Sequence, residues 1–99
     1  MLKQAHLYIK GDVIGVGFRA WTKIQAKIFG VTGWVKNNFD HPDVFGPGGG
    51  VEAQIQGEED KLTTFLEVVK KGPPVSHVNN TEILWQEPTE IFDDFKIVR

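Results

Sequence analysis

The spacing of apolar residues changes from that of a strand to that of a helix across one glycine-rich run, residues 11–19. Before this run, residues 5–10 alternate, with Ala5, Leu7 and Ile9 on one face and His6, Tyr8 and Lys10 on the other, as in a half-buried strand. After it, apolar residues recur every three or four positions, as in a helix: Phe18, Trp21, Ile24 and Ile28. Gly30 then follows at the position of a C-terminal cap. This order fixes the first unit of the fold as strand, glycine loop and helix.

Four more strands and one more helix are expected downstream. The strands are predicted at residues 31–37, 51–56, near 78–85 and near 95–98. In the strand at 51–56, Val51, Ala53 and Ile55 are expected to point inward and Glu52, Gln54 and Gln56 outward. The helix is expected to start at the acidic run 58–60 and to end before Gly72 and the two prolines that follow. Its apolar face holds Leu62, Phe65, Leu66 and Val69.

This order of elements predicts an α+β fold of the ferredoxin-like, split βαβ type. The order is β-α-β-β-α-β with a short strand added at the C-terminus, and it predicts an antiparallel sheet with two helices on one face. Residues 1–99 are expected to form a single domain. The fold class says little about function, because it hosts many activities.

Composition narrows the chemistry and the compartment. The chain has no cysteine, which excludes disulfides, thiol catalysis and cysteine metal sites. Three scattered histidines lack metal-ligand spacing, so we expect no metal site. The formal net charge of −2 argues against a nucleic-acid partner, which would need a basic patch. No signal peptide or membrane-spanning stretch is recognised, so we expect a cytoplasmic protein without a membrane partner.

The run 11–19 has the character of an anion-binding loop. Glycines let backbone N–H groups approach a ligand closely, and the start of a helix supplies unpaired N–H donors. Arg19 lies where the helix dipole disfavours a cation, as expected at a functional site rather than in a neutral connection. Taken alone, however, the loop is also explained as a tight connection and Arg19 as a solvated surface residue. The run 11–19 also lacks the sequence pattern of the phosphate loops that bind nucleotides.

Two motifs make the chain resemble the acylphosphatase family. The family signature G-x-V-Q-G-V-x-F-R is matched by Gly11-Asp12-Val13-Ile14-Gly15-Val16-Gly17-Phe18-Arg19 in all but the glutamine. A second signature, G-W-V-K-N, is present as Gly33-Trp34-Val35-Lys36-Asn37. A third similarity is the junction Gly72-Pro73-Pro74 followed by Val78. The resemblance extends over essentially the whole chain.

The resemblance implies hydrolysis of the carboxyl–phosphate bond of small acyl phosphates, giving a carboxylate and inorganic phosphate without metal or cofactor. By motif position, Arg19 would bind the phosphate and Asn37 would orient the attacking water. The backbone N–H groups of Ile14, Gly15, Val16, Gly17, Phe18 and Arg19 would complete the phosphate site. The substrate and inorganic phosphate are the partners expected, and we expect the chain to act as a monomer.

The residue types suit this chemistry. An acyl phosphate is an activated mixed anhydride, so it needs positioning and charge stabilisation more than a strong acid or base. The planar guanidinium of arginine matches phosphate oxygens, and an asparagine amide can hold a water without being a base. Asp12 is the only carboxylate inside or beside either motif, so we infer that a phosphate oxygen of the substrate accepts the proton from water. Taken alone, Asn37 is also explained as a strand-end turn residue, although Asn38 would serve that purpose equally well.

The chain departs from the family pattern at two places. Ile14 replaces the usual glutamine, which matters little if the loop binds phosphate through its backbone. The larger departure is the insertion His41 to Gly48, between the strands at 31–37 and 51–56. With its glycines and prolines it predicts a flexible connection, interpreted either as a mobile surface loop or as a lid that brings Val44 or Phe45 to the acyl group.

Three other functions stay open at this stage. The first is a non-catalytic module that binds an anion or metabolite on the same fold. The second is an RNA-binding sheet, which would need exposed aromatic residues such as Tyr8 and Trp34 in a basic strand sequence. The third is a domain of a larger maturation enzyme, which the end of the chain directly after the last expected strand disfavours. Measurement of phosphate release from a simple acyl phosphate separates the first alternative from catalysis.

Overall fold

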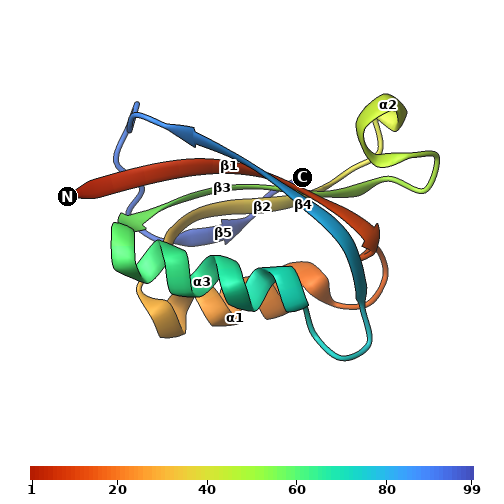
Figure 1. Ribbon diagram of the computed structural model, residues 1–99, viewed down its shortest axis with the longest axis horizontal. Coiled ribbons are helices and arrows are strands. Elements are labelled where there is room, and N and C mark those ends of the chain that lie inside the picture. The colour runs from red at the N-terminus through yellow and green to blue at the C-terminus, as the bar shows by residue number, and fades with distance from the viewer.

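The computed structural model describes all 99 residues, and it contains a five-stranded sheet with two helices packed on one face (Figure 1). The sheet order is β4-β1-β3-β2-β5. The elements are β1 (Leu2–Asp12), α1 (Phe18–Phe29), β2 (Thr32–Asn38), α2 (Pro42–Phe45), β3 (Gly50–Glu58), α3 (Glu59–Lys71), β4 (His77–Gln86) and β5 (Phe95–Ile97). This arrangement confirms the predicted ferredoxin-like α+β fold.

The sheet is mixed rather than purely antiparallel, because β5 runs parallel to β2. The other neighbours, β4 with β1, β1 with β3 and β3 with β2, are antiparallel. The cause is the path of residues 87–94. This segment leaves the end of β4 and passes Gln56 of β3, whose amide contacts the backbone of Glu90 and Phe92. It then reaches the end of the sheet where β2 begins, so β5 can only run in the same direction as β2.

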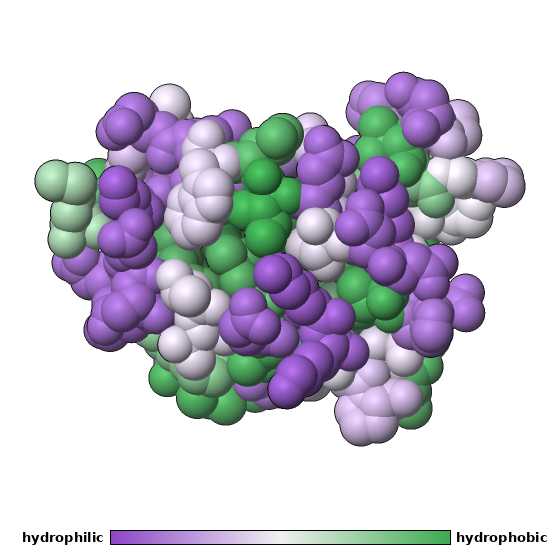
Figure 2. Space-filling model, in the orientation of Figure 1, coloured by the Kyte–Doolittle hydropathy of each residue, from purple (hydrophilic) through white to green (hydrophobic).

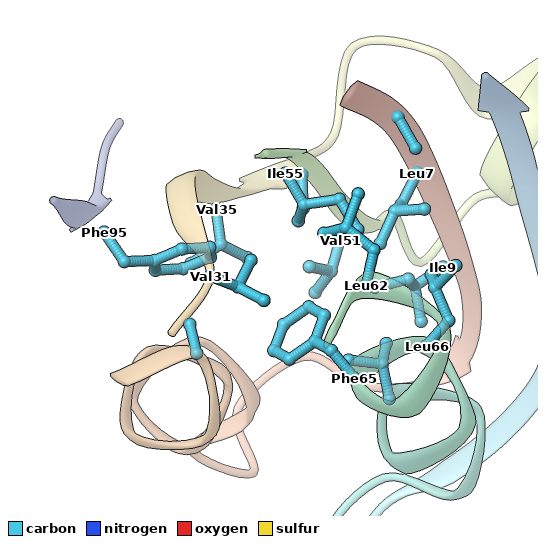
Figure 3. Close-up of a cluster of buried hydrophobic side chains, with 14 of the residues drawn as sticks. Leu7, Ile9, Val31, Val35, Val51, Ile55, Leu62, Phe65, Leu66 and Phe95 are labelled. Carbon is cyan, nitrogen blue, oxygen red and sulfur yellow. The ribbon is translucent and has the colours of Figure 1, made fainter. Parts of the chain in front are cut away.

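The hydrophobic core lies between the sheet and the two long helices. The inward residues of β1 and β3 predicted from alternation are fully buried, and so is Phe65 of α3. In Figure 3 the Phe65 side chain points from α3 into the middle of this cluster. Its ring lies 6.5 Å from that of Phe29 and 6.4 Å from that of Phe95, so it joins both helices to β5. The predicted apolar face of α3 is confirmed by its buried residues, Leu62, Phe65, Leu66 and Val69.

The predicted apolar face of α1 is partly wrong. Ile24 and Ile28 are 58% and 67% exposed. The buried positions are instead Phe18, Thr22 and Ala26, four residues apart on one stripe. Small residues allow the helix to approach the sheet closely, and Thr22 is tolerated there because its hydroxyl donates to the Phe18 carbonyl oxygen at 2.7 Å.

Gln56 of β3 was expected to point outward to solvent, but its side chain is buried. It lies on the polar face of β3, but it is only 1% exposed because residues 87–94 cover it. Its Nε2 donates to Gln4 Oε1 at 3.0 Å and to the Glu90 carbonyl oxygen at 2.6 Å. Its Oε1 accepts from the backbone N–H of Phe92 at 3.0 Å. A buried amide with these partners avoids the cost of an unsatisfied polar group.

The insertion after β2 contains a short helix, α2, on the side of the sheet opposite the two long helices (Figure 1). Phe45 is only 9% exposed, and its ring lies 5.8 Å from that of Tyr8 on β1. Hydrophilic residues surround α2 on the molecular surface, while a hydrophobic patch lies over β4 (Figure 2). The insertion is therefore anchored to the open face of the sheet by one aromatic side chain.

The substitution Phe45→Ala should lower the free energy of unfolding by about 1–3 kcal/mol, less than a central core phenylalanine, because Phe45 lies outside the main hydrophobic core. Urea unfolding followed by tryptophan fluorescence measures this loss. Val44→Ala, a partly buried neighbour on the same helix, is the matched control and should cost less. Equal losses for the two variants would contradict an anchoring role for Phe45.

Candidate active site

The loop between β1 and α1 forms a short curved segment whose glycines are required by the backbone. Gly15 and Gly17 both have a φ of +76°, in the left-handed region that other residues rarely adopt. A Cβ at either position would meet nothing within 4 Å, so the need for glycine comes from backbone conformation and not from crowding. Val13 and Phe18, each 1% exposed, hold the two ends of the loop in the core.

The start of α1 is arranged to receive an anion. Gly17 is the N-cap, no side chain caps the helix, and the first turn contains no acidic residue. The first N–H groups of a helix have no partner within it, and they carry partial positive charge. Arg19 lies in this first turn, and none of the ion pairs in the structure involves it. The loop therefore presents backbone donors and an unpaired guanidinium on one side.

Asn37 reaches the same place from β2. The inward positions of β2 are Gly33 and Val35, so Asn37, two residues further on, lies on the helix side of the sheet at the end of the strand. Gly33 allows the close strand pairing that places it, because a Cβ there would lie 1.8 Å from the carbonyl oxygen of Gln54. Arg19 and Asn37 line a common pocket of about 170 Å³. The pocket lining is completed by Val13, Gly15, Gly17, Phe18, Ala20 and Ile97.

Asn38 performs the turn function that sequence reasoning left open between the two asparagines. It is 6% exposed and points to the opposite face of the sheet from Asn37. Its Oδ1 accepts from the backbone N–H of Asp40 at 2.9 Å, which closes the turn after β2. The side chain of Asn37 is thereby left available to the pocket.

The structure brings together most, but not all, of the predicted site residues. Gly15, Gly17, Phe18 and Arg19 line the pocket with Asn37, whereas Ile14 and Val16 do not. The side chains of Ile14 and Val16 pack against the core and line a separate hollow of about 550 Å³. Ile14 and Val16 could therefore contact a ligand in the pocket only through their backbone N–H groups.

Sequence reasoning missed three lining residues: Val13, Ala20 and Ile97. Val13 lies inside the first motif and Ala20 directly follows it, but neither apolar side chain gave a sequence signal of a pocket. Ile97 could have been found by alternation, since it shares the parity of the buried Phe95. It is 40% exposed because it lies at the pocket rather than in the core.

The insertion does not lie over this pocket. Neither Val44 nor Phe45 lines it, and Phe45 instead packs on Tyr8 across the sheet. Phe45, Gly48 and Gly49 line the separate hollow behind the loop, beside Ile14 and Val16. The interpretation of the insertion as a lid is not supported by this placement. The insertion instead shares a hollow with the outer side of the loop.

A charged cluster lies on the open face of the sheet, on the other side from the pocket. Glu52 of β3 contacts His6 Nε2 at 2.5 Å through Oε2, and its Oε1 accepts from Asn38 Nδ2 at 2.8 Å. Lys36 Nζ lies 3.9 Å from the same Oε1. Burial by itself raises the pKa of Glu52, but the hydrogen bonds from Asn38 and His6 and the charges of His6 and Lys36 outweigh it. The pKa of Glu52 therefore lies below its ordinary value.

The substitution Glu52→Gln should remove a pH-dependent part of the stability. Because the pKa of Glu52 is lower in the folded state, its contribution is fully present above the unfolded-state pKa of about 4.3. It is lost as the pH falls through the lower folded-state pKa. Urea unfolding of both proteins between about pH 6 and about pH 3 measures the effect. The gap in free energy between them should narrow toward acid, and a gap that stays constant would contradict the ionised cluster.

None of the helices combines the length and the apolar composition that a membrane span requires.

Comparison with known proteins identifies the class to which this geometry belongs. The family model described as Acylphosphatase matches residues 5–97. An acylphosphatase from Pyrobaculum islandicum is 42% identical over 95 residues, which cover 96% of this chain and 93% of the relative. The crystal structure of acylphosphatase from Bacillus subtilis is similar with a TM-score of 0.86 and 35% identity, over 100% of both chains. A crystal structure of full-length HypF has a TM-score of 0.84 and 28% identity, and the match covers 100% of this chain and 12% of that one. The chain therefore belongs to the acylphosphatase family of hydrolytic enzymes.

Proposed function

We propose that this chain is a single-domain enzyme that hydrolyses small acyl phosphates to a carboxylate and inorganic phosphate, with Arg19 and Asn37 as its catalytic residues. One observation carries the proposal. An unpaired arginine, a left-handed glycine loop at a helix start and an asparagine from the neighbouring strand all line one pocket. The phosphoryl group is held by Arg19 and by backbone N–H groups of residues 14–19, and the reaction needs no metal.

Arg19 and the loop bind and stabilise the transferring phosphoryl group. The guanidinium can donate two parallel hydrogen bonds to two phosphate oxygens, and it stays charged at any relevant pH. Backbone N–H groups of the loop and of the first turn of α1 donate to the remaining oxygens. Because these donors are fixed by buried ends of the loop, they are in place before charge develops in the transition state.

Asn37 orients the water that attacks phosphorus. Its amide both donates and accepts hydrogen bonds, so it holds the water in line with the leaving carboxylate. The oxygen of water forms the new bond to phosphorus, and the bond from phosphorus to the acyl oxygen breaks. The carboxylate leaves with that electron pair. The proton from water passes to a phosphate oxygen of the substrate.

The positions of the acidic and histidine residues support this route for the proton. Asp12 is exposed and lines the hollow behind the loop rather than the pocket. His6 lies on the open face of the sheet in contact with Glu52, and none of the three histidines lines the pocket. A steep limb of the pH–rate profile that disappears on replacing Asp12 or a histidine would contradict substrate-assisted proton transfer.

Phosphate release from acetyl phosphate tests the function directly. We expect hydrolysis well above the uncatalysed rate, unchanged by EDTA, with competitive inhibition by inorganic phosphate. Loss of the activity in EDTA would contradict a metal-independent reaction. Competitive binding of phosphate without hydrolysis would instead favour a non-catalytic module for anions.

A further inference from the structure

The charged cluster on the open face of the sheet has no part in the reaction described above, although several hydrogen bonds link its side chains. It consists of His6, Lys36, Asn38, Glu52 and Gln54, which come from three neighbouring strands. The side chains of His6 and Glu52 are each only 13% exposed. A carboxylate with so little access to water is costly unless it is paired and hydrogen-bonded.

Both carboxylate oxygens of Glu52 and both ring nitrogens of His6 have a partner in the cluster. Glu52 accepts from Asn38 with one carboxylate oxygen and contacts His6 with the other. The second ring nitrogen of His6, Nδ1, lies 2.7 Å from Gln54 Oε1, so both nitrogens face oxygen atoms. A histidine ring held at both nitrogens has its orientation fixed, and Glu52 is fixed with it.

Asn38 connects this cluster to the end of β2. Its Nδ2 donates to Glu52, while its Oδ1 accepts from the Asp40 backbone N–H and lies 3.2 Å from His41 Nδ1. One buried side chain thus ties β2 to β3 and closes the turn that follows. The residue before it, Asn37, pairs with Val51 and points to the opposite side, into the pocket. Any rotation of the backbone at Asn38 would therefore move the Asn37 amide.

We infer that Asn38 and Glu52 are positioning residues that hold the Asn37 amide in the orientation needed to align the attacking water. The inference rests on the proposed role of Asn37. The physical reason is that alignment of the water is sensitive to displacements of about 1 Å, which can cost about 100-fold in rate. Asn37 itself has no hydrogen bond to another side chain in the structure, so its orientation depends on the backbone that carries it.

The test separates alignment of water from binding of phosphate. Asn38→Ala should lower kcat for acetyl phosphate by about 10- to 100-fold, while KM and the inhibition constant for inorganic phosphate stay within about twofold. Unchanged inhibition by phosphate also shows that the variant is folded. Glu52→Ala should behave like Asn38→Ala. Glu52→Gln keeps an oxygen acceptor for Asn38 Nδ2 and should recover part of the rate.

Glu82→Gln is the matched control. Glu82 lies on the same face of the sheet, on β4, where Lys10 approaches it at 3.8 Å, and it has no contact with Asn38. The kcat of the Glu82→Gln variant should equal that of the unmodified protein. Asn38→Ala with a kcat equal to that of Glu82→Gln would overturn the inference, and so would a parallel loss of kcat and phosphate affinity.

A double variant distinguishes failure of this inference from failure of the proposed function. If Asn38 acts only through Asn37, the variant Asn37→Ala/Asn38→Ala should be no slower than Asn37→Ala alone. Additive losses would overturn the positioning role and leave the role of Asn37 intact. Full activity in Asn37→Ala would overturn the proposed role of Asn37, whatever the result for Asn38→Ala, whereas the absence of acetyl phosphate hydrolysis by the unmodified protein would overturn the proposed function itself.

Discussion

Arg19→Ala is expected to lower kcat/KM for acetyl phosphate by about 1,000-fold or more, the largest effect of any single substitution in the pocket. Arg19 is the only cationic side chain that lines the pocket, so its removal leaves the phosphoryl charge to the backbone donors alone. Competitive inhibition by inorganic phosphate should weaken in parallel, because ground-state binding uses the same group. Steady-state kinetics with phosphate as inhibitor measure both losses.

Stability provides the control for this loss. Arg19 is partly exposed, makes no ion pair and lies at the helix end where the dipole disfavours a cation. Arg19→Ala should therefore leave the free energy of unfolding unchanged or raise it by about 0.3–1 kcal/mol. Arg19→Lys keeps the charge but loses the planar fork of donors, so it should retain only part of the activity. If Arg19→Ala kept activity within about tenfold of the original, the proposed phosphate site would be wrong.

The first motif illustrates what could be predicted from sequence. The alternation of residues 5–10 and the helical spacing after the glycines are local patterns, and they placed β1, the loop and α1 correctly. The same spacing named Ile24 and Ile28 as the apolar face, although both are exposed. Which stripe of a helix is buried depends on what packs against it, and the close approach of the sheet favours the smaller residues Thr22 and Ala26.

Contacts between residues far apart in the sequence explain the other differences between the predicted and the observed structure. Gln56 reads as an outward residue by alternation, and only the path of residues 87–94 buries it. The same path makes β5 parallel to β2, which no local pattern encodes. Phe45 lies in a run of glycines and prolines typical of a mobile loop, yet its ring is held by Tyr8 on a strand far away in sequence. In each case a tertiary contact determines the burial or strand direction, which the periodicity of the sequence does not encode.

The candidate site was predictable to the extent that it lies in two short motifs. Arg19 and Asn37 were named from motif position, and the structure places them on one pocket. The Glu52 cluster gave no signal in sequence, because its members come from β1, β2 and β3 and meet only through strand register. Register also decides between Asn37 and Asn38, since a shift of one residue would exchange their faces.

Asn37→Ala is expected to lower kcat by about 100- to 1,000-fold, with little change in the inhibition constant for inorganic phosphate. Arg19 and the loop, the proposed phosphate ligands, are unchanged in this variant, whereas the attacking water would lose the amide proposed to align it. Arg19→Ala should weaken phosphate inhibition as well as the rate, whereas Asn37→Ala should lower kcat alone. This difference would show that one residue binds phosphate and the other aligns the water. Steady-state kinetics on acetyl phosphate with phosphate as inhibitor measure it. Asn37→Asp sharpens the result, since its charge adds repulsion of the phosphoryl group and should weaken phosphate inhibition as well. If Asn37→Ala raised the inhibition constant as strongly as Arg19→Ala does, Asn37 would be a phosphate ligand, and the water would have to be aligned by another group.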